Sequence, residues 1–125
     1  MTFTKAGIIL FTARYDACVD FYHRILGLEI LHRVDQPGER LTTLMLGGTY
    51  LMIETGGVAH DGAKPLDISP IKFRFNVPDV KATSDMLRDR GIDIRVIDHS
   101  WGTTAEFHDP DGNRCALRSD AGFGI

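Results

Sequence analysis

An internal repeat constrains this chain more than any other feature of its sequence. The segment Gly27 to Ile30 (GLEI) resembles Gly91 to Ile94 (GIDI), 64 residues later. Each copy follows a stretch with apolar residues at helical spacing, and each precedes three segments with strand character. Half of a 125-residue chain is too small to hold a hydrophobic core alone. We therefore expect the two halves to pack as one domain.

The first copy is predicted to contain one strand, one helix and three further strands. The helix covers Tyr15 to Leu26, because Val19, Tyr22 and Leu26 recur at helical spacing. Gly27 follows at the position where a helix often ends in a left-handed residue. The strands are predicted at Ala6 to Thr12, Leu28 to Val34, Arg40 to Leu46 and Thr49 to Thr55, with turns at Pro37-Gly38 and Gly47-Gly48.

The second copy is predicted to repeat this order. Asp79 is the expected N-cap of a helix that Gly91 closes, with Val80, Thr83 and Leu87 on its buried face. The strands are predicted at Ile71 to Val77, Ile92 to Asp98, Thr103 to His108 and Asn113 to Arg118. The resulting organisation is module one over 1–57, a linker over 58–69, module two over 70–120 and a tail over 121–125.

Composition narrows the classes of partner. The chain is 43% hydrophobic and 25% charged, as expected of a globular protein, and its net charge of −3 gives no basic surface for nucleic acid. No apolar run has the length of a membrane span, and the first residues lack the features of a signal peptide. Cys18 and Cys115 are expected to be buried free thiols. We expect a cytoplasmic protein that binds neither membranes nor nucleic acid.

Three motifs carry a resemblance to a known family. The run Phe21 to Leu28 resembles the FY…LG(L/F) signature of the vicinal oxygen chelate superfamily, the family of glyoxalases, bleomycin-resistance proteins and extradiol dioxygenases. Val77 to Val80 resembles the entry to the second helix of these proteins. Trp101-Gly102 with Phe107 to Asn113 resembles their closing hairpin. The resemblance implies an α+β fold in which two βαβββ modules form curled mixed sheets around a cavity, with helices outside and a homodimer as the usual assembly.

The resemblance also locates four metal-ligand positions, which metal enzymes of this family fill with His, Glu or Gln. In this chain those positions carry Gly7, Glu54, Lys72 and Ala116. Glycine and alanine have no donor side chain, and a lysine ammonium repels a divalent ion. The five histidines show no close pairing in the sequence. We therefore expect no metal and no other cofactor.

Strand alternation predicts what lines the cavity instead. Lys72, Arg74 and Asn76 alternate with apolar residues and are expected to face the cavity. Arg114 and Arg118 share that face with Ala116, and Tyr50 and Met52 share theirs with Glu54. The candidate ligand-binding residues are Tyr50, Glu54, Lys72, Arg74, Asn76, Trp101, His108 and Arg114.

Two functions remain open on the sequence alone. The first is a metal-independent small-molecule-binding protein, with a cavity suited to a small anionic or aromatic ligand that Lys72 and Arg74 would bind through charged hydrogen bonds. The second is a glyoxalase-like lyase or isomerase, or a dioxygenase, with an atypical or metal-free site in which Lys72 or Glu54 would serve as acid or base. Whether the chain is an enzyme is therefore not decided by its sequence.

Overall fold

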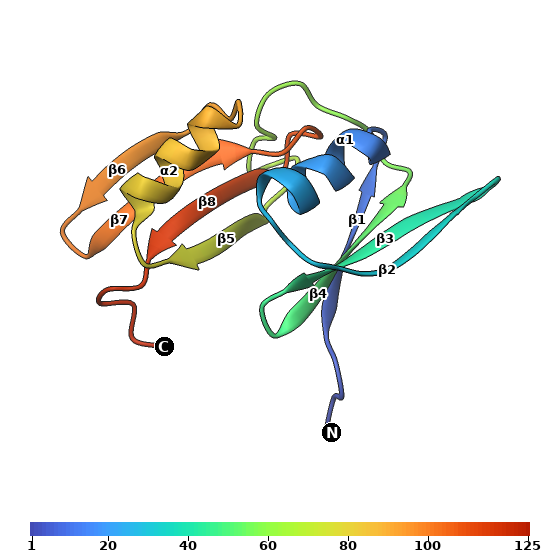
Figure 1. The fold of residues 1–125 in the computed structure, drawn as a ribbon, viewed down its shortest axis with the longest axis horizontal. Helices are drawn as coiled ribbons and strands as arrows, with labels where there is room; N and C mark the ends of the chain where they lie inside the picture. Colours follow the sequence, from blue (N-terminus) through green and yellow to red (C-terminus); the bar gives the residue numbers. More distant parts are fainter. The chain divides into compact units, whose positions relative to one another are not determined.

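The computed structural model describes residues 1–125 and contains two four-stranded sheets of the same topology (Figure 1). The first sheet has the order β1-β4-β3-β2 and the second the order β5-β8-β7-β6, and both are curled but not closed. In each sheet the first pair is parallel and the other two pairs are antiparallel. The strands are β1 (Gly7–Thr12), β2 (Ile30–Gln36), β3 (Glu39–Leu46), β4 (Thr49–Thr55), β5 (Lys72–Val77), β6 (Arg95–His99), β7 (Gly102–His108) and β8 (Arg114–Ser119). The repeated βαβββ unit predicted from the sequence is confirmed.

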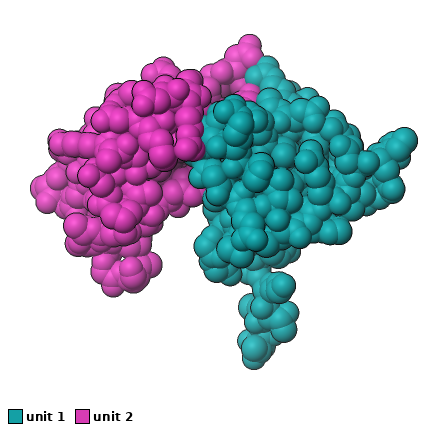
Figure 2. Space-filling view, viewed as in Figure 1, with its two compact units in different colours: residues 1–59 teal, residues 60–125 magenta.

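The chain forms two compact units, residues 1–59 and residues 60–125 (Figure 2). Each unit contains one sheet and the helix that covers it. Residues 60–69, which the sequence suggested as part of a linker, belong to the second unit. Two backbone hydrogen bonds attach the start of this segment to the second unit. They run from His60 N to Asp111 O at 3.1 Å and from Lys64 N to Gly112 O at 2.7 Å.

The helix of the first unit changes character halfway. Helix α1 (Tyr15–Asp20) continues as the π-helical turn η1 (Phe21–Ile25), whereas the sequence predicted one uninterrupted α-helix. The amide of Leu26 bonds the carbonyl of Phe21, five residues earlier. Phe21, Tyr22 and Ile25 are all buried around this wider turn, whereas Leu26, expected on the buried face, is only half-buried.

The helix of the second unit follows its prediction closely. Helix α2 (Val80–Asp89) is capped by Asp79, whose Oδ1 accepts the Ala82 amide at 3.0 Å. Val80 and Leu87 are buried against the sheet. Both glycines predicted to end a helix are left-handed, with φ +80° at Gly27 and φ +90° at Gly91.

Strands β2 and β6 begin later than the alternation of residues predicted. The amide of Leu28 still bonds the carbonyl of Tyr22, and that of Ile92 bonds Leu87, so both residues finish the preceding helix. Strand pairing therefore starts only at Ile30 and at Arg95.

Cys18 and Cys115 form no disulfide and are fully buried, as predicted. No helix of the structure combines the length and apolar character that crossing a bilayer requires.

Candidate functional site

In the first unit, β4 places Tyr50, Met52 and Glu54 on one face of the sheet, as predicted. Tyr50 is the register partner of Gly7 on β1, and Met52 is the partner of Thr43 on β3. Because register partners point to the same side, all five residues share this face.

Gly7 and Tyr50 are in close contact. A β-carbon built at Gly7 would lie 2.1 Å from Cε2 of Tyr50 and 2.2 Å from Cζ, far inside any van der Waals contact. The tyrosine ring therefore fills the space next to the main chain of Gly7. The sequence resemblance assigns one of the family's metal-ligand positions to Gly7.

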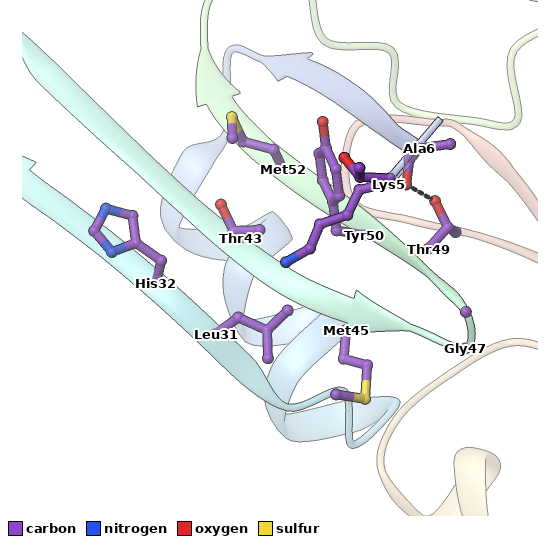
Figure 3. A pocket seen from close by; sticks show the side chains of 12 residues that line it. Lys5, Ala6, Leu31, His32, Thr43, Met45, Gly47, Thr49, Tyr50 and Met52 are labelled. Atoms are coloured by element: carbon purple, nitrogen blue, oxygen red, sulfur yellow. Dashed lines mark hydrogen bonds between the residues drawn. The ribbon is translucent and has the colours of Figure 1, made fainter. Parts of the chain in front are cut away.

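The tyrosine ring also lines a pocket of about 560 Å³ in the first unit (Figure 3). Its apolar wall includes Leu31, Met45 and Met52. Its polar groups come from Lys5, His32, Thr43 and Tyr50, and none of these side chains forms a hydrogen bond or ion pair within the chain.

Of these pocket residues, sequence reasoning identified only Tyr50 as a ligand-binding candidate, with Met52 on its face. Alternation along β3 could have found Thr43, which is the register partner of both Met52 and His32. Lys5 precedes the first strand, so no strand pattern could have indicated it.

In the second unit, Lys72, Arg74 and Asn76 do share one face with Arg114, Ala116 and Arg118, through the register of β5 and β8. Lys72, His108 and Arg114 line one pocket of about 630 Å³, together with Asp93, Arg95 and Glu106. The structure thus brings three of the predicted site residues together.

Glu106 is the partner of Lys72 that sequence reasoning missed. The Lys72 ammonium lies 3.1 Å from Oε2 of Glu106 and 3.2 Å from Oε1. The sequence suggested that Lys72 is available to bind an anionic ligand, whereas the structure pairs it with Glu106. This pocket carries charges of both signs.

Arg114 and His108 bind the main chain. The Arg114 guanidinium donates to the carbonyl oxygens of Ser69 at 2.6 Å and Ile71 at 3.1 Å, and also to that of Lys64. Nδ1 of His108 lies 2.9 Å from the Asp109 carbonyl oxygen. Arg114 thereby attaches the segment that leads into β5 to the sheet.

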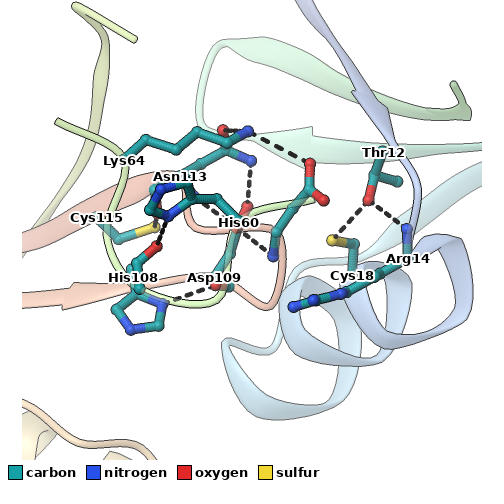
Figure 4. A network of polar contacts seen from close by, with 11 residues as sticks. Thr12, Arg14, Cys18, His60, Lys64, His108, Asp109, Asn113 and Cys115 are labelled. Carbon is teal, nitrogen blue, oxygen red and sulfur yellow. Dashed lines mark hydrogen bonds and ion pairs between the residues drawn. The ribbon is translucent and has the colours of Figure 1, made fainter. Parts of the chain in front are cut away.

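A buried turn stands beside these residues (Figure 4). Oδ1 of Asp109 accepts the amides of Asp111 at 2.9 Å and Asn113 at 2.8 Å, and Oδ2 accepts the Asn113 side-chain amide at 2.8 Å. The Lys64 ammonium lies 3.0 Å from Oδ1 of Asn113 and 3.4 Å from Oδ2 of Asp111. This network fixes the turn between β7 and β8, so we assign it a structural role.

Trp101, predicted as a stacking platform, already has stacking neighbours. The His99 ring lies parallel to it at 4.2 Å, and the Arg118 guanidinium lies 4.9 Å from its centroid. Arg118 also donates to the Trp101 carbonyl at 3.2 Å. The indole is 52% exposed, so part of it still faces solvent.

The remaining candidates lie outside both pockets. The Arg74 guanidinium stands 5.4 Å from the ring centroid of Phe123. Asn76 is exposed, and Glu54 is half-buried on the face that carries Tyr50.

The four positions that the resemblance assigns to metal ligands do not fit a metal ion in this chain. Gly7 and Ala116 offer no donor, the Tyr50 ring fills the space at Gly7, and Lys72 is engaged with Glu106. Only Glu54 could serve as a ligand. Nowhere in the chain do three His, Cys, Asp or Glu side chains come close enough together to hold a metal.

The fold belongs to a known class of proteins. The sequence profile of the glyoxalase/bleomycin resistance protein/dioxygenase superfamily matches residues 6–117, so the chain belongs to that superfamily. A search of curated proteins finds no match.

Solved structures share the fold at low sequence identity. The fosfomycin resistance protein FosX from Listeria monocytogenes is similar with a TM-score of 0.76 and 13% identity, over 97% of this chain and 96% of that one. Lactoylglutathione lyase from Agrobacterium tumefaciens is similar with a TM-score of 0.72 and 17% identity, over 99% of this chain and 98% of that one. TnmS3, an antibiotic-binding protein from Streptomyces sp. CB03234, is similar with a TM-score of 0.70 and 19% identity, over 94% of this chain and 96% of that one.

Proposed function

We propose that this chain is a metal-independent small-molecule-binding protein of the glyoxalase/bleomycin resistance superfamily, with a cavity suited to a small anionic or aromatic ligand. The observation that carries the proposal is the Tyr50 ring over Gly7. An aromatic side chain takes the space from which a metal ligand would project, and the same ring lines a pocket of ligand size. The similarity to the antibiotic-binding protein TnmS3 supports a binding function of this kind.

Ligand screening tests the proposal on the full chain. We expect a subset of small aromatic molecules to raise the melting temperature, and Tyr50→Ala to abolish that response. Phe123→Ala, in the second unit and outside the pocket, is the matched control. A ligand response that survives Tyr50→Ala, or one that appears only after a divalent metal is added, would contradict the proposal.

The Lys72–Glu106 pair favours one alternative, a metal-free lyase or isomerase. An ammonium and a carboxylate at 3.1 Å could exchange a proton with a substrate in the pocket that His108 also lines. Turnover of a small carbonyl compound that Glu106→Gln abolishes, in the presence of chelator, would favour this alternative over a binding protein.

We further propose that the two units act as one domain and that the protein is a cytoplasmic homodimer. Ile9 and Phe11, on the same face as Glu54, are 49% and 52% exposed. Apolar side chains of this kind are typical of surfaces that a second subunit covers. Sedimentation at micromolar concentration should show a dimer, and a persistent monomer would refute this assembly.

A further inference from the structure

We propose that the Tyr50 pocket binds a small aromatic carboxylate, with Lys5 as the partner of the carboxylate. This inference rests on the proposed function and names its ligand class. A ligand-binding site combines a few convergent polar groups with an apolar wall, and the Tyr50 pocket contains both.

Thr43 offers a hydrogen-bonding group to a ligand. The residue is only 9% exposed, and its hydroxyl has no hydrogen-bond partner in the chain. The hydroxyl oxygen keeps some accessibility, so it can donate or accept a hydrogen bond with a molecule bound in the pocket. The hydroxyl of Tyr50 and the imidazole of His32 also line the pocket without a partner.

The charge of the pocket wall selects an anion. No Asp or Glu lines this pocket, although the chain as a whole carries a net charge of −3. Lys5 supplies the one permanent charge, and its side chain extends across the strands toward Thr43 (Figure 3). The pocket of the second unit differs in this respect, because Glu106 already neutralises Lys72 there.

The apolar wall selects an aromatic body. Thioether groups of Met45 and Met52 and the ring of Tyr50 surround the space, and both kinds of group contact aromatic rings favourably. A volume of about 560 Å³ accommodates one or two fused rings. The ring would lie against Tyr50, and the carboxylate would accept hydrogen bonds from Lys5 and Thr43.

Three probes of the same shape test this assignment: 2-naphthoate, 2-naphthalenemethanol and 2-naphthylmethylamine. We expect calorimetry to show naphthoate binding about 10-fold more tightly than the alcohol, the effect of one charged hydrogen bond. Lys5→Gln should remove this 10-fold advantage and leave the affinity for the alcohol unchanged. Lys81→Gln, an exposed lysine on α2, is the matched control and should change neither affinity. Amide shifts in NMR spectra should map to residues 4–7, 43–45 and 47–52.

Each contrary result has a distinct meaning. Tightest binding of the amine, or an equal loss for all three probes in Lys5→Gln, would overturn the carboxylate assignment and leave the proposed function standing. Shifts confined to residues 60–125 would overturn the assignment to the Tyr50 pocket. If none of the three probes binds, the aromatic carboxylate assignment is overturned, and the proposed function then depends on the wider ligand screen.

Discussion

The ammonium of Lys72 on β5 and the carboxylate of Glu106 on β7 meet at 3.1 Å across the intervening strand β8. The register places Ala116 of β8 next to Glu106, and Ala116 is only 1% exposed. A long acidic side chain at position 116, as metal enzymes of the family carry, would stand beside Glu106 and compete for Lys72. The Lys72–Glu106 ion pair is therefore compatible with alanine at position 116 but not with a long acidic side chain there.

Breaking this pair should have a small effect on stability. Lys72→Met and Glu106→Gln should each lower the free energy of unfolding by less than about 1 kcal/mol, because both side chains are partly exposed and water screens the pair. The double variant should lose little more unfolding free energy than either single variant. High salt should reduce the differences in stability between the variants and the original chain. Urea unfolding measures all three, and a loss above about 2 kcal/mol would show that the pair is far better shielded than its exposure indicates.

Gly7→Ala tests the contact with Tyr50. The new methyl group would overlap the tyrosine ring, which must turn away, and we expect the free energy of unfolding to fall by about 1 kcal/mol. Aromatic ligands should also bind more weakly. Gly62→Ala, outside the pocket, is the matched control, since a β-carbon there meets nothing within 4 Å. The cost of Gly7→Ala should largely disappear in a Tyr50→Ala background, and a cost that persists there would contradict the steric explanation.

Arg118→Met should be the most destabilising of these changes. Arg118 is 4% exposed and donates to Oγ of Ser119 at 2.7 Å and to carbonyl oxygens of Trp101, Ser119 and Ala121. Loss of these charged hydrogen bonds should lower the free energy of unfolding by about 2 to 4 kcal/mol. Fluorescence of Trp101, the chain's one tryptophan, should change in the folded state. Arg33→Met, an exposed position on β2, should leave both measurements unaltered.

Elemental analysis tests the ligand positions directly. Protein purified without chelator should carry no stoichiometric Zn, Ni, Mn or Fe, because three of the four family positions hold Gly7, Lys72 and Ala116. About one tightly bound metal ion per chain would contradict both this prediction and the assignment of those positions.

The fold was predictable because local patterns specify it. Helical spacing, strand alternation and the turn glycines located each element within a few residues. The π-helical turn was not predictable, since Phe21, Tyr22 and Ile25 fit an α-helical pattern equally well.

The site was predictable only in part, for a related reason. Alternation assigned Lys72 and Tyr50 to a face, but the partner of Lys72 depends on the pairing of strands distant in sequence. Main-chain hydrogen bonds such as those of Arg114 have no sequence signal at their acceptors.

The docking of residues 60–71 on the second sheet has a practical consequence for dividing the chain. The last hydrogen bond of the first unit at the junction runs from Gly56 N to Thr12 O, and the first of the second unit begins at His60. Val58 and Ala59 form no hydrogen bond with either unit. A reporter segment inserted between them would interrupt no strand pairing, and a cut there would leave the four strands of each sheet on one fragment.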